Sequence, residues 1–290
     1  DYETLSKINP KIVYASVSAY GPDAPDGHLP GTDAVGQALS GIAEAYSIPG
    51  NNLRTGVASV ADESCAILTF GGILAAYINA QKTGKGQKLE TSLVGSAFRL
   101  LGWTMTTAMW SNKPPITGAR INGTRERPGI AACFNDTDGK PFALQLDPDS
   151  WEKAMKALNF YDILKKDNLI DLGQAFDSNE KKTMILNKLA ELFSTEKRDN
   201  WISILRDADM ISTHVNTMLE ASDDPNIKEN NYVTEVWYPE LNKNMKVHGS
   251  PWKFSKTPAN IKRAPKLGEH NSELLSSLGY SDKEIKDLIE

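Results

Sequence analysis

The stretch "RTGVASVADESCAILTFGG" (residues 54–72) places two carboxylates, Asp62 and Glu63, at the start of an almost wholly apolar run. The run continues without proline to about residue 81 and is followed by "KTGKGQ" (82–87). This pattern predicts a helix over about 63–81 that Asp62 caps, with Gly84 in the left-handed conformation after the last turn. The apolar run is short for a bilayer span, so we expect a buried core helix.

Strand-like segments flank this helix on both sides. "KIVYASVSAYG" (11–21) is a continuous apolar run with β-branched residues, and "KLETSLV" (88–94) alternates between apolar and polar positions. A second helix is expected over 32–46, before the long one, and a third over 93–110. The order strand, helix, helix, strand predicts an α/β fold with a parallel sheet and crossover connections.

The pattern changes after the breaker "NKPPITG" (112–118), where we place a domain boundary. Beyond it, "AACF" and "PFALQL" flank the turn "NDTDGK" (135–140), which predicts a β-hairpin. Amphipathic helices then dominate to about residue 220, strand-like stretches return from Val233, and a small helix is expected at 282–289. The second part of the chain therefore has an α+β pattern.

Composition limits the classes of function. The chain has 290 residues, 40% of them hydrophobic, and 32 basic against 37 acidic residues give a net charge of -5. No basic stripe is present, so neither nucleic acid nor an anionic membrane is an expected partner. Two distant cysteines, Cys65 and Cys133, indicate a reducing compartment and hence a cytoplasmic protein. Four scattered histidines give no metal-ligand spacing, so no metal site is expected.

Asp62 can be interpreted in two compatible ways. Aspartate is a favoured N-cap, and capping alone stabilises a helix by about 1 kcal/mol. A carboxylate at a helix N-terminus is also ionised without help, and it can attack a thioester carbonyl directly to give a mixed anhydride. No histidine base is needed because there is no proton to remove. The N–H groups at the helix start could then receive the developing oxyanion.

Two neighbours of Asp62 have simpler roles. Glu63, in the first turn, favours the helix dipole. Cys65 lies on nearly the same helical face as Asp62, but a small buried core cysteine is the favoured interpretation.

Four separated segments resemble the class III CoA-transferases of the carnitine-dehydratase and bile-acid-transferase type. They are "NPKIVYASVSAYGPDAP", "PGTDAVGQALSGI", "RTGVASVADESCAILTFGGILAAYINAQKTGKGQKLETSL" and "GSPWKFSKTPANIKRAPKLGEHNSELLSSLGYS". In this family the aspartate that opens the helix before the "TGKGQ" turn is the nucleophile, which implies that role for Asp62. The implied intermediates are an aspartyl-acyl anhydride and an aspartyl-CoA thioester. Coenzyme A thioesters are then substrates, and no permanently bound cofactor is implied.

The resemblance is strongest to transferases that place CoA on 2-hydroxy acids, such as phenyllactate or 2-hydroxyisocaproate, during amino-acid fermentation. Members that act on oxalate carry a glycine run that is missing between residues 118 and 145, so oxalate is disfavoured. The related racemases have histidine where this chain has Thr32, which disfavours proton shuttling. Two alternatives stay open: an acyl-CoA racemase, and a non-catalytic partial domain in which Asp62 only caps a helix.

The resemblance also implies the surroundings of Asp62. The strand end that carries Ser18, Tyr20 and Gly21 corresponds to a part of the family that faces CoA and the acyl group. We assign three further residues to substrate or CoA binding: Gln37, Ala61 and Glu63. Trp103, Met105, Met109 and Trp110 could line an apolar pocket for the acceptor acid, although packing in the core is favoured for most of them.

The implied fold is a Rossmann-like large α/β domain, with an N-terminal part of its sheet that this chain lacks, plus a smaller α+β domain. Residues 1–115 would form part of the large domain with the catalytic helix, 116–225 the small domain, and 226–290 a return to the large domain. Family members form interlocked dimers, so we expect a homodimer.

Overall fold

The computed structural model describes residues 1–47, 56, 58–113, 129–175 and 178–289, and the chain divides into two compact units. Unit 1 comprises residues 1–122 and unit 2 residues 123–290. The boundary expected near residue 115 lies outside the described residues. The return of 226–290 to the large domain stays a prediction.

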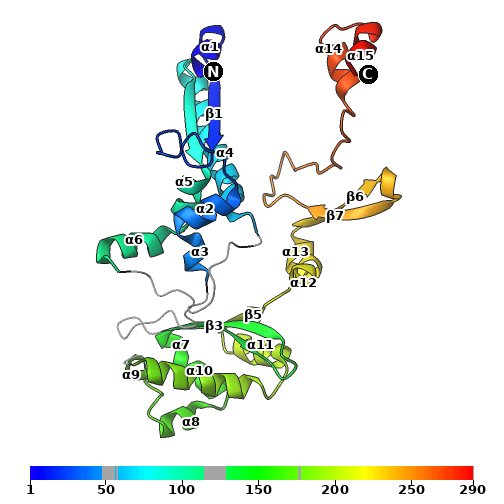
Figure 1. Cartoon of the computed structure of the whole chain (residues 1–290). Helices are drawn as coiled ribbons and strands as arrows, with labels where there is room; N and C mark the ends of the chain where they lie inside the picture. Colours follow the sequence, from blue (N-terminus) through cyan, green and yellow to red (C-terminus); the bar gives the residue numbers. More distant parts are fainter. Residues whose placement is uncertain (48–55, 57, 114–128, 176–177, 290) are drawn as a thin grey trace. The chain divides into compact units, whose positions relative to one another are not determined.

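Unit 1 is built on a parallel strand pair (Figure 1). β1 (Val13–Ser18) pairs in parallel with β2 (Gln87–Ser92), in a register that runs from Val13 opposite Gln87 to Ser18 opposite Ser92. The helix α4 (Val60–Thr83) lies between them in sequence and packs on both strands. The predicted parallel crossover is confirmed, whereas the wider Rossmann-like sheet stays a prediction.

Two of the predicted helices are each split by a glycine. The segment 32–46 forms α2 (Asp33–Ser40) and α3 (Ile42–Ala45), separated by Gly41 with a φ of 90°. The segment 93–110 forms α5 (Leu93–Leu100) and α6 (Gly102–Ser111), and Gly102 has a φ of 45°. A positive φ interrupts the right-handed helix, and glycine adopts it without a steric penalty. Unit 1 begins with a further helix, α1 (Tyr2–Ile8).

α4 starts earlier than its apolar run suggests. Its N-cap is Ser59 and its first residue is Val60, so Asp62 lies in the first turn and the prediction that Asp62 is the N-cap was wrong. The helix end follows the prediction, because Gly84 is in the left-handed conformation with a φ of 74°.

The two faces of α4 differ in burial. Small residues at helical spacing, Cys65, Thr69, Gly72 and Ala76, form the face toward the sheet, and a Cβ at Gly72 would lie 2.8 Å from the Leu89 side chain of β2. Cys65 is 2% exposed, which confirms the core cysteine. The opposite face is apolar but exposed, so the expected buried helix is covered on only one side within this chain. Its large exposed residues are Ile67, Leu68, Phe70, Leu74, Tyr77 and Ile78.

α4 is also long and apolar enough to cross a membrane, judged by length and composition alone. Its packing against β1 and β2 is that of a crossover helix in an α/β sheet. The helix α6 has no buried residue, so the core packing expected for most of Trp103, Met105, Met109 and Trp110 is wrong within the described chain.

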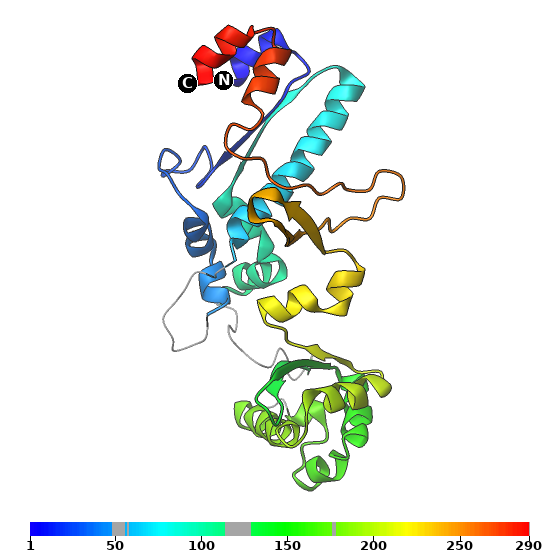
Figure 2. The same cartoon turned by 90° about the vertical axis from the view of Figure 1, so that its right-hand side faces the viewer.

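Unit 2 contains an antiparallel sheet of three strands in the order β3-β4-β5. These are β3 (Ile130–Asn135), β4 (Pro141–Leu146) and β5 (Ile211–His214), and the first two form the predicted hairpin. Helices lie on one side of this sheet (Figures 1 and 2), and Phe134, Phe142 and Phe193 pack ring against ring in between. The helices are α7 (Pro148–Ala157), α8 (Tyr161–Lys166), α9 (Leu172–Ala175), α10 (Asn179–Phe193) and α11 (Arg198–Asp207).

The rest of unit 2 consists of short helices and strands that are joined by segments without regular secondary structure. The predicted return to strands is an antiparallel pair, β6 (Val233–Tyr238) and β7 (Lys243–His248), joined by the 3-10 helix Pro239–Leu241. The small helix expected at 282–289 is confirmed as α15 (Asp282–Ile289). The remaining helices are α12 (Met218–Asp223), α13 (Pro225–Glu229) and α14 (Asn271–Ser277).

Candidate active site

The two parallel strands of unit 1 end side by side, and the chain turns away from both at the same edge. Ser18 lies opposite Ser92 in the register. The Ser18 Oγ accepts a hydrogen bond from the Gly21 N–H at 3.0 Å, and the Ser92 Oγ accepts one from the Gly95 N–H at 3.0 Å, which caps α5. Ligands of open α/β sheets bind at this carboxyl edge.

Three of the predicted site residues meet at the end of β1. Ser18, Tyr20 and Gly21 are all half-buried there, and Gly21 has a φ of 103°, which lets the backbone reverse just after the strand. Because a Cβ at Gly21 would lie 3.7 Å from the Ser92 Oγ, this turn covers the end of β2 as well. Their predicted contact with CoA stays a prediction.

Asp62 stands at the end of the small-residue face of α4. It lies three and seven residues before Cys65 and Thr69, so all three share the side that packs toward the sheet. Unlike them, Asp62 is exposed. Its carboxylate forms no hydrogen bond or ion pair with the part of the chain that the structure describes. The side chain is therefore available at the edge where the strands end.

The backbone N–H groups at the start of α4 all donate hydrogen bonds within the protein. Val60 donates to the Ala58 carbonyl at 2.8 Å, and Glu63 donates to the Ser59 carbonyl at 2.9 Å. The N–H groups of Ala61 and Asp62 both donate to the carboxylate of Asp33 on α2. The expectation that these groups receive an oxyanion was wrong, because each one already donates a hydrogen bond within the protein.

Asp33 of α2 supplies the carboxylate that caps α4. Its Oδ1 accepts hydrogen bonds from the N–H groups of Ala61 at 2.8 Å and Asp62 at 3.2 Å. No side chain within α4 or its N-cap Ser59 makes a capping bond. The interpretation of Asp62 as a helix cap therefore loses its structural basis, since Asp33 occupies that position.

Gln37 lies one turn after Asp33 and is 1% exposed. Its Nε2 donates to the Asp33 Oδ2 at 2.5 Å and to the Ala58 carbonyl at 3.3 Å. Its Oε1 accepts from the Gly56 N–H at 2.7 Å. Both ends of the amide are thus bonded to the protein, so its described contacts give Gln37 a structural position, and its predicted substrate contact stays a prediction.

Ala61 and Glu63 flank Asp62 in different environments. Ala61 is fully buried against α2, where a Cβ added at Gly36 would lie 2.5 Å from the Ala61 Cβ. Glu63 is exposed and borders an apolar cavity of about 350 Å³. The α4 residues of that cavity recur at helical spacing on the side opposite Asp62, since successive residues advance by about 100°. They are Val60, Glu63, Ser64, Ile67 and Leu68.

The capping role of Asp33 could not be predicted from the sequence. Asp33 is 28 residues before Ala61, and its local pattern indicated only the start of the helix 32–46. Capping signals in a sequence identify acceptors within the same helix, whereas this acceptor comes from a different one.

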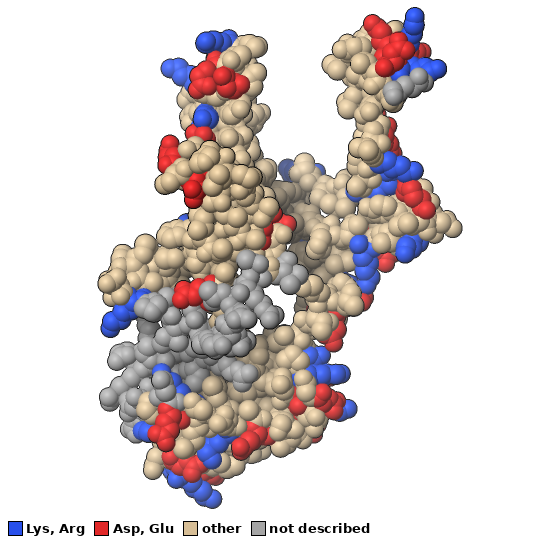
Figure 3. Space-filling view, viewed as in Figure 1, with Lys and Arg blue, Asp and Glu red and all other residues tan. Residues whose placement is uncertain are grey.

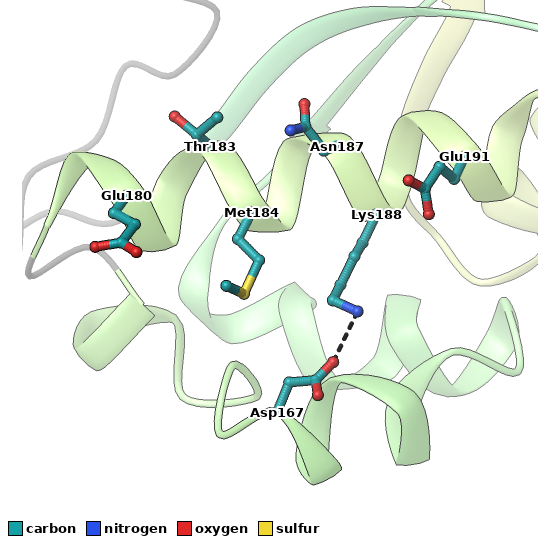
Figure 4. A pocket seen from close by; sticks show the side chains of 7 residues that line it. All are labelled: Asp167, Glu180, Thr183, Met184, Asn187, Lys188 and Glu191. Atoms are coloured by element: carbon teal, nitrogen blue, oxygen red, sulfur yellow. Dashed lines mark ion pairs between the residues drawn. The ribbon is translucent and has the colours of Figure 1, made fainter.

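A second hollow lies in unit 2, and none of the predicted site residues lines it (Figure 4). It has a volume of about 730 Å³ and runs along α10, where Lys188 pairs with Asp167 at 2.8 Å. The remaining side chains on its wall diverge and supply no nucleophile with a base. Among the residues that the structure describes, no three His, Cys, Asp or Glu side chains are grouped to hold a metal ion.

Comparison with known proteins identifies the family. Residues 1–271 match the sequence model of CoA-transferase family III. The chain belongs to this family. The cinnamoyl-CoA:phenyllactate CoA-transferase of Clostridium sporogenes is 25% identical over 99% of this chain and 70% of its own length. The formyl-CoA:oxalate CoA-transferase of Escherichia coli O157:H7 is 26% identical over 98% of this chain and 72% of its own length.

Solved structures agree on the fold. A CAIB/BAIF family protein from Brucella suis has a TM-score of 0.80 at 21% identity and covers 96% of this chain and 71% of its own. A Mycobacterium tuberculosis protein, Rv3272, has a TM-score of 0.73 at 18% identity, with coverage of 94% and 71%. The mixed α/β fold is therefore that of CaiB/BaiF structures.

Membership in CoA-transferase family III and the named relatives support a transferase enzyme that uses CoA thioesters as substrates. The two relatives act on different acids at nearly equal identity, so the comparison does not separate a phenyllactate-type from an oxalate-type acceptor.

Proposed function

We propose that this family III protein moves CoA from an acyl-CoA donor to a carboxylic acid acceptor, with Asp62 as the nucleophile. The single observation that supports this role is the state of the Asp62 carboxylate. It is exposed at the carboxyl edge of the strands, and Asp33 does the capping that would otherwise engage it.

The proposed reaction proceeds by carbonyl substitutions that need no proton transfer. The Asp62 carboxylate attacks the carbonyl carbon of the donor thioester and forms a C–O bond. The C–S bond breaks, CoA departs as a thiolate, and an aspartyl-acyl anhydride remains. The thiolate attacks the Asp62 carbonyl, which releases the donor acid and leaves an aspartyl-CoA thioester. The acceptor carboxylate displaces the thiolate to form a new anhydride. The thiolate then takes the acceptor acyl group and frees Asp62.

A covalent trapping experiment tests this proposal. The protein is incubated with an acyl-CoA, treated with hydroxylamine or borohydride, and its peptides are analysed by mass. We expect an adduct on the peptide that contains Asp62, and a loss of transfer of roughly 10³-fold or more in Asp62→Asn. Asp149→Asn is the matched control, because Asp149 is also an exposed first-turn carboxylate but lies on α7.

An unmodified Asp62 peptide, together with full transfer in Asp62→Asn, contradicts the proposal. An inactive but folded wild-type protein that binds acyl-CoA would instead favour the non-catalytic alternative. The racemase alternative has less support, because Thr32, the N-cap of α2, carries no imidazole. Deuterium exchange at the α-carbon of a branched acyl-CoA tests it directly.

For the acceptor we propose a 2-hydroxy acid, because the glycine run that the resemblance associates with oxalate is missing from residues 118–145. A panel of 2-hydroxy acids and oxalate, assayed with one acyl-CoA donor, tests this choice. Faster transfer to oxalate than to any 2-hydroxy acid would overturn it. We further propose a cytoplasmic homodimer.

A further inference from the structure

The start of α4 depends on a residue from another helix. Two N–H groups of its first turn, those of Ala61 and Asp62, donate to one oxygen of Asp33 on α2. The N-cap Ser59 makes no side-chain bond that could replace Asp33. The orientation of the turn that carries Asp62 is therefore set by α2.

The Asp33 carboxylate is in turn held by Gln37. The Gln37 Nε2 donates to the Asp33 Oδ2 at 2.5 Å, so Oδ1 points to α4. The same amide is bonded to the backbone of Ala58 and Gly56, just before α4. Since Gln37 is buried, these bonds fix Asp33 and the entry to α4 as one unit, the Asp33–Gln37 clamp.

The clamp has a consequence for the Asp62 carboxylate. N–H groups of a first helical turn need an acceptor, and an acidic side chain in the same turn is drawn toward them. Without Asp33, the acidic side chains left in the same turn to accept from these groups are those of Asp62 and Glu63. If the Asp62 carboxylate accepted hydrogen bonds from its own turn, its oxygen would be a weaker nucleophile. It would also point away from a bound thioester.

We propose that Asp33 and Gln37 are positioning residues for the nucleophile: they satisfy the first turn of α4 from outside and so keep the Asp62 carboxylate unengaged. This inference rests on the proposed function. It adds two residues that touch no reacting atom.

The test compares Asp33→Ala with wild type in two measurements. Hydrogen exchange of the backbone amides in residues 58–64 reports the clamp without reference to catalysis, and we expect faster exchange in the variant. The rate at which acyl-CoA labels Asp62 reports positioning. It should fall by about 10- to 100-fold, the scale of a small misplacement of a reacting group, with the affinity for CoA unchanged.

A second substitution distinguishes positioning from general destabilisation. Ser59→Asp supplies a local acceptor at the N-cap, which can accept from the same two N–H groups. In Asp33→Ala combined with Ser59→Asp, we expect slow exchange again and recovery of most of the labelling rate. Asp149→Ala serves as the control for loss of a first-turn carboxylate elsewhere.

The possible results distinguish failure of the positioning role from failure of the proposed function. A folded Asp33→Ala that exchanges faster but labels at the wild-type rate overturns the positioning role while leaving the proposed function in place. Absence of labelling in wild type overturns the proposed function and this inference together. If Asp33→Ala does not fold, Gln37→Met is used instead, since it keeps Asp33 and side-chain volume but removes the bonds that orient the carboxylate. An unchanged labelling rate in Gln37→Met also contradicts the inference.

Discussion

At the scale of single residues, the carboxylates of Asp33 and Asp136 accept hydrogen bonds that hold the backbone in place. The Asp62 carboxylate makes no such bond with the described residues. Asp33 caps α4 from α2, and Asp136 holds a turn in unit 2. The sequence predicted an aspartate cap for α4 but assigned it to Asp62, which was wrong. Its assignment to Asp33 could not be predicted, because the two helices meet only in the folded chain.

Asp136 gives a prediction for the pH dependence of stability. Burial alone would raise the pKa of this carboxyl, but N–H bonds from Arg198, Lys140 and Asp138, together with the Arg198 charge, lower it below its usual value. Its stabilising contribution is therefore present above the unfolded-state pKa of about 3.9 and is lost as the pH falls through the lower folded-state value.

Asp136→Asn should lower the free energy of unfolding by about 1–3 kcal/mol at neutral pH, because an amide NH₂ would face an N–H donor. Urea unfolding at pH 7 and below pH 4 should show this difference shrinking in acid. Asp138→Asn, an exposed neighbour, should change stability by less than about 0.5 kcal/mol. A deficit in Asp136→Asn that is equally large in acid would contradict the prediction.

At the scale of elements, the crossover helix was predictable and its contacts were not. Apolar length and the "TGKG" turn predicted α4 and its end at Gly84. Hydrophobicity does not indicate the face that α2 buries, because its apolar residue Leu39 is 60% exposed. The buried residues are instead Gly36, Gln37 and Ser40. Close helix packing and the Asp33–Gln37 clamp select small and polar residues there, and hydrophobic periodicity cannot detect them.

Two glycines of these helices should respond in opposite ways to alanine. Gly71, on the exposed side of α4, has no atom of this chain within 4 Å of an added Cβ, so Gly71→Ala should stabilise the monomeric chain by about 0.5–1 kcal/mol through helix propensity. Gly36 packs on Ala61 and Leu93, so Gly36→Ala should destabilise it by about 1–3 kcal/mol. Thermal unfolding measures the change in stability of both variants. If both substitutions stabilise the protein, helix propensity rather than packing determines the effect at Gly36.

At the scale of the whole molecule, unit 1 exposes many large apolar side chains, and exposed apolar patches mark interaction surfaces. The outward side of α4 is exposed, α6 has no buried residue, and Figure 3 shows mostly uncharged surface over α5 and α6. Trp103 and Trp110 are 87% and 86% exposed. Such a surface supports the proposed homodimer, which the sequence suggested only through family resemblance.

A paired charge substitution tests that assembly. Leu74→Glu combined with Ile78→Glu places two carboxylates on the exposed apolar side of α4, so we expect the dimer to dissociate to monomers. Light scattering after size-exclusion chromatography measures the mass, and Gln81→Glu is the control for an added charge at a polar exposed position. A monomeric wild type, or a double variant that stays dimeric, argues against this interface.

If Asp33 positions Asp62 as we propose, the reactivity of Asp62 also depends on tertiary structure. In a nascent chain with α4 formed but α2 not yet docked, the N–H groups of the helix start are left to the acids of the same turn, at positions 62 and 63. Competence for acyl chemistry would then arrive only with docking, and a partly folded chain would be spared from modification by the cell's thioesters.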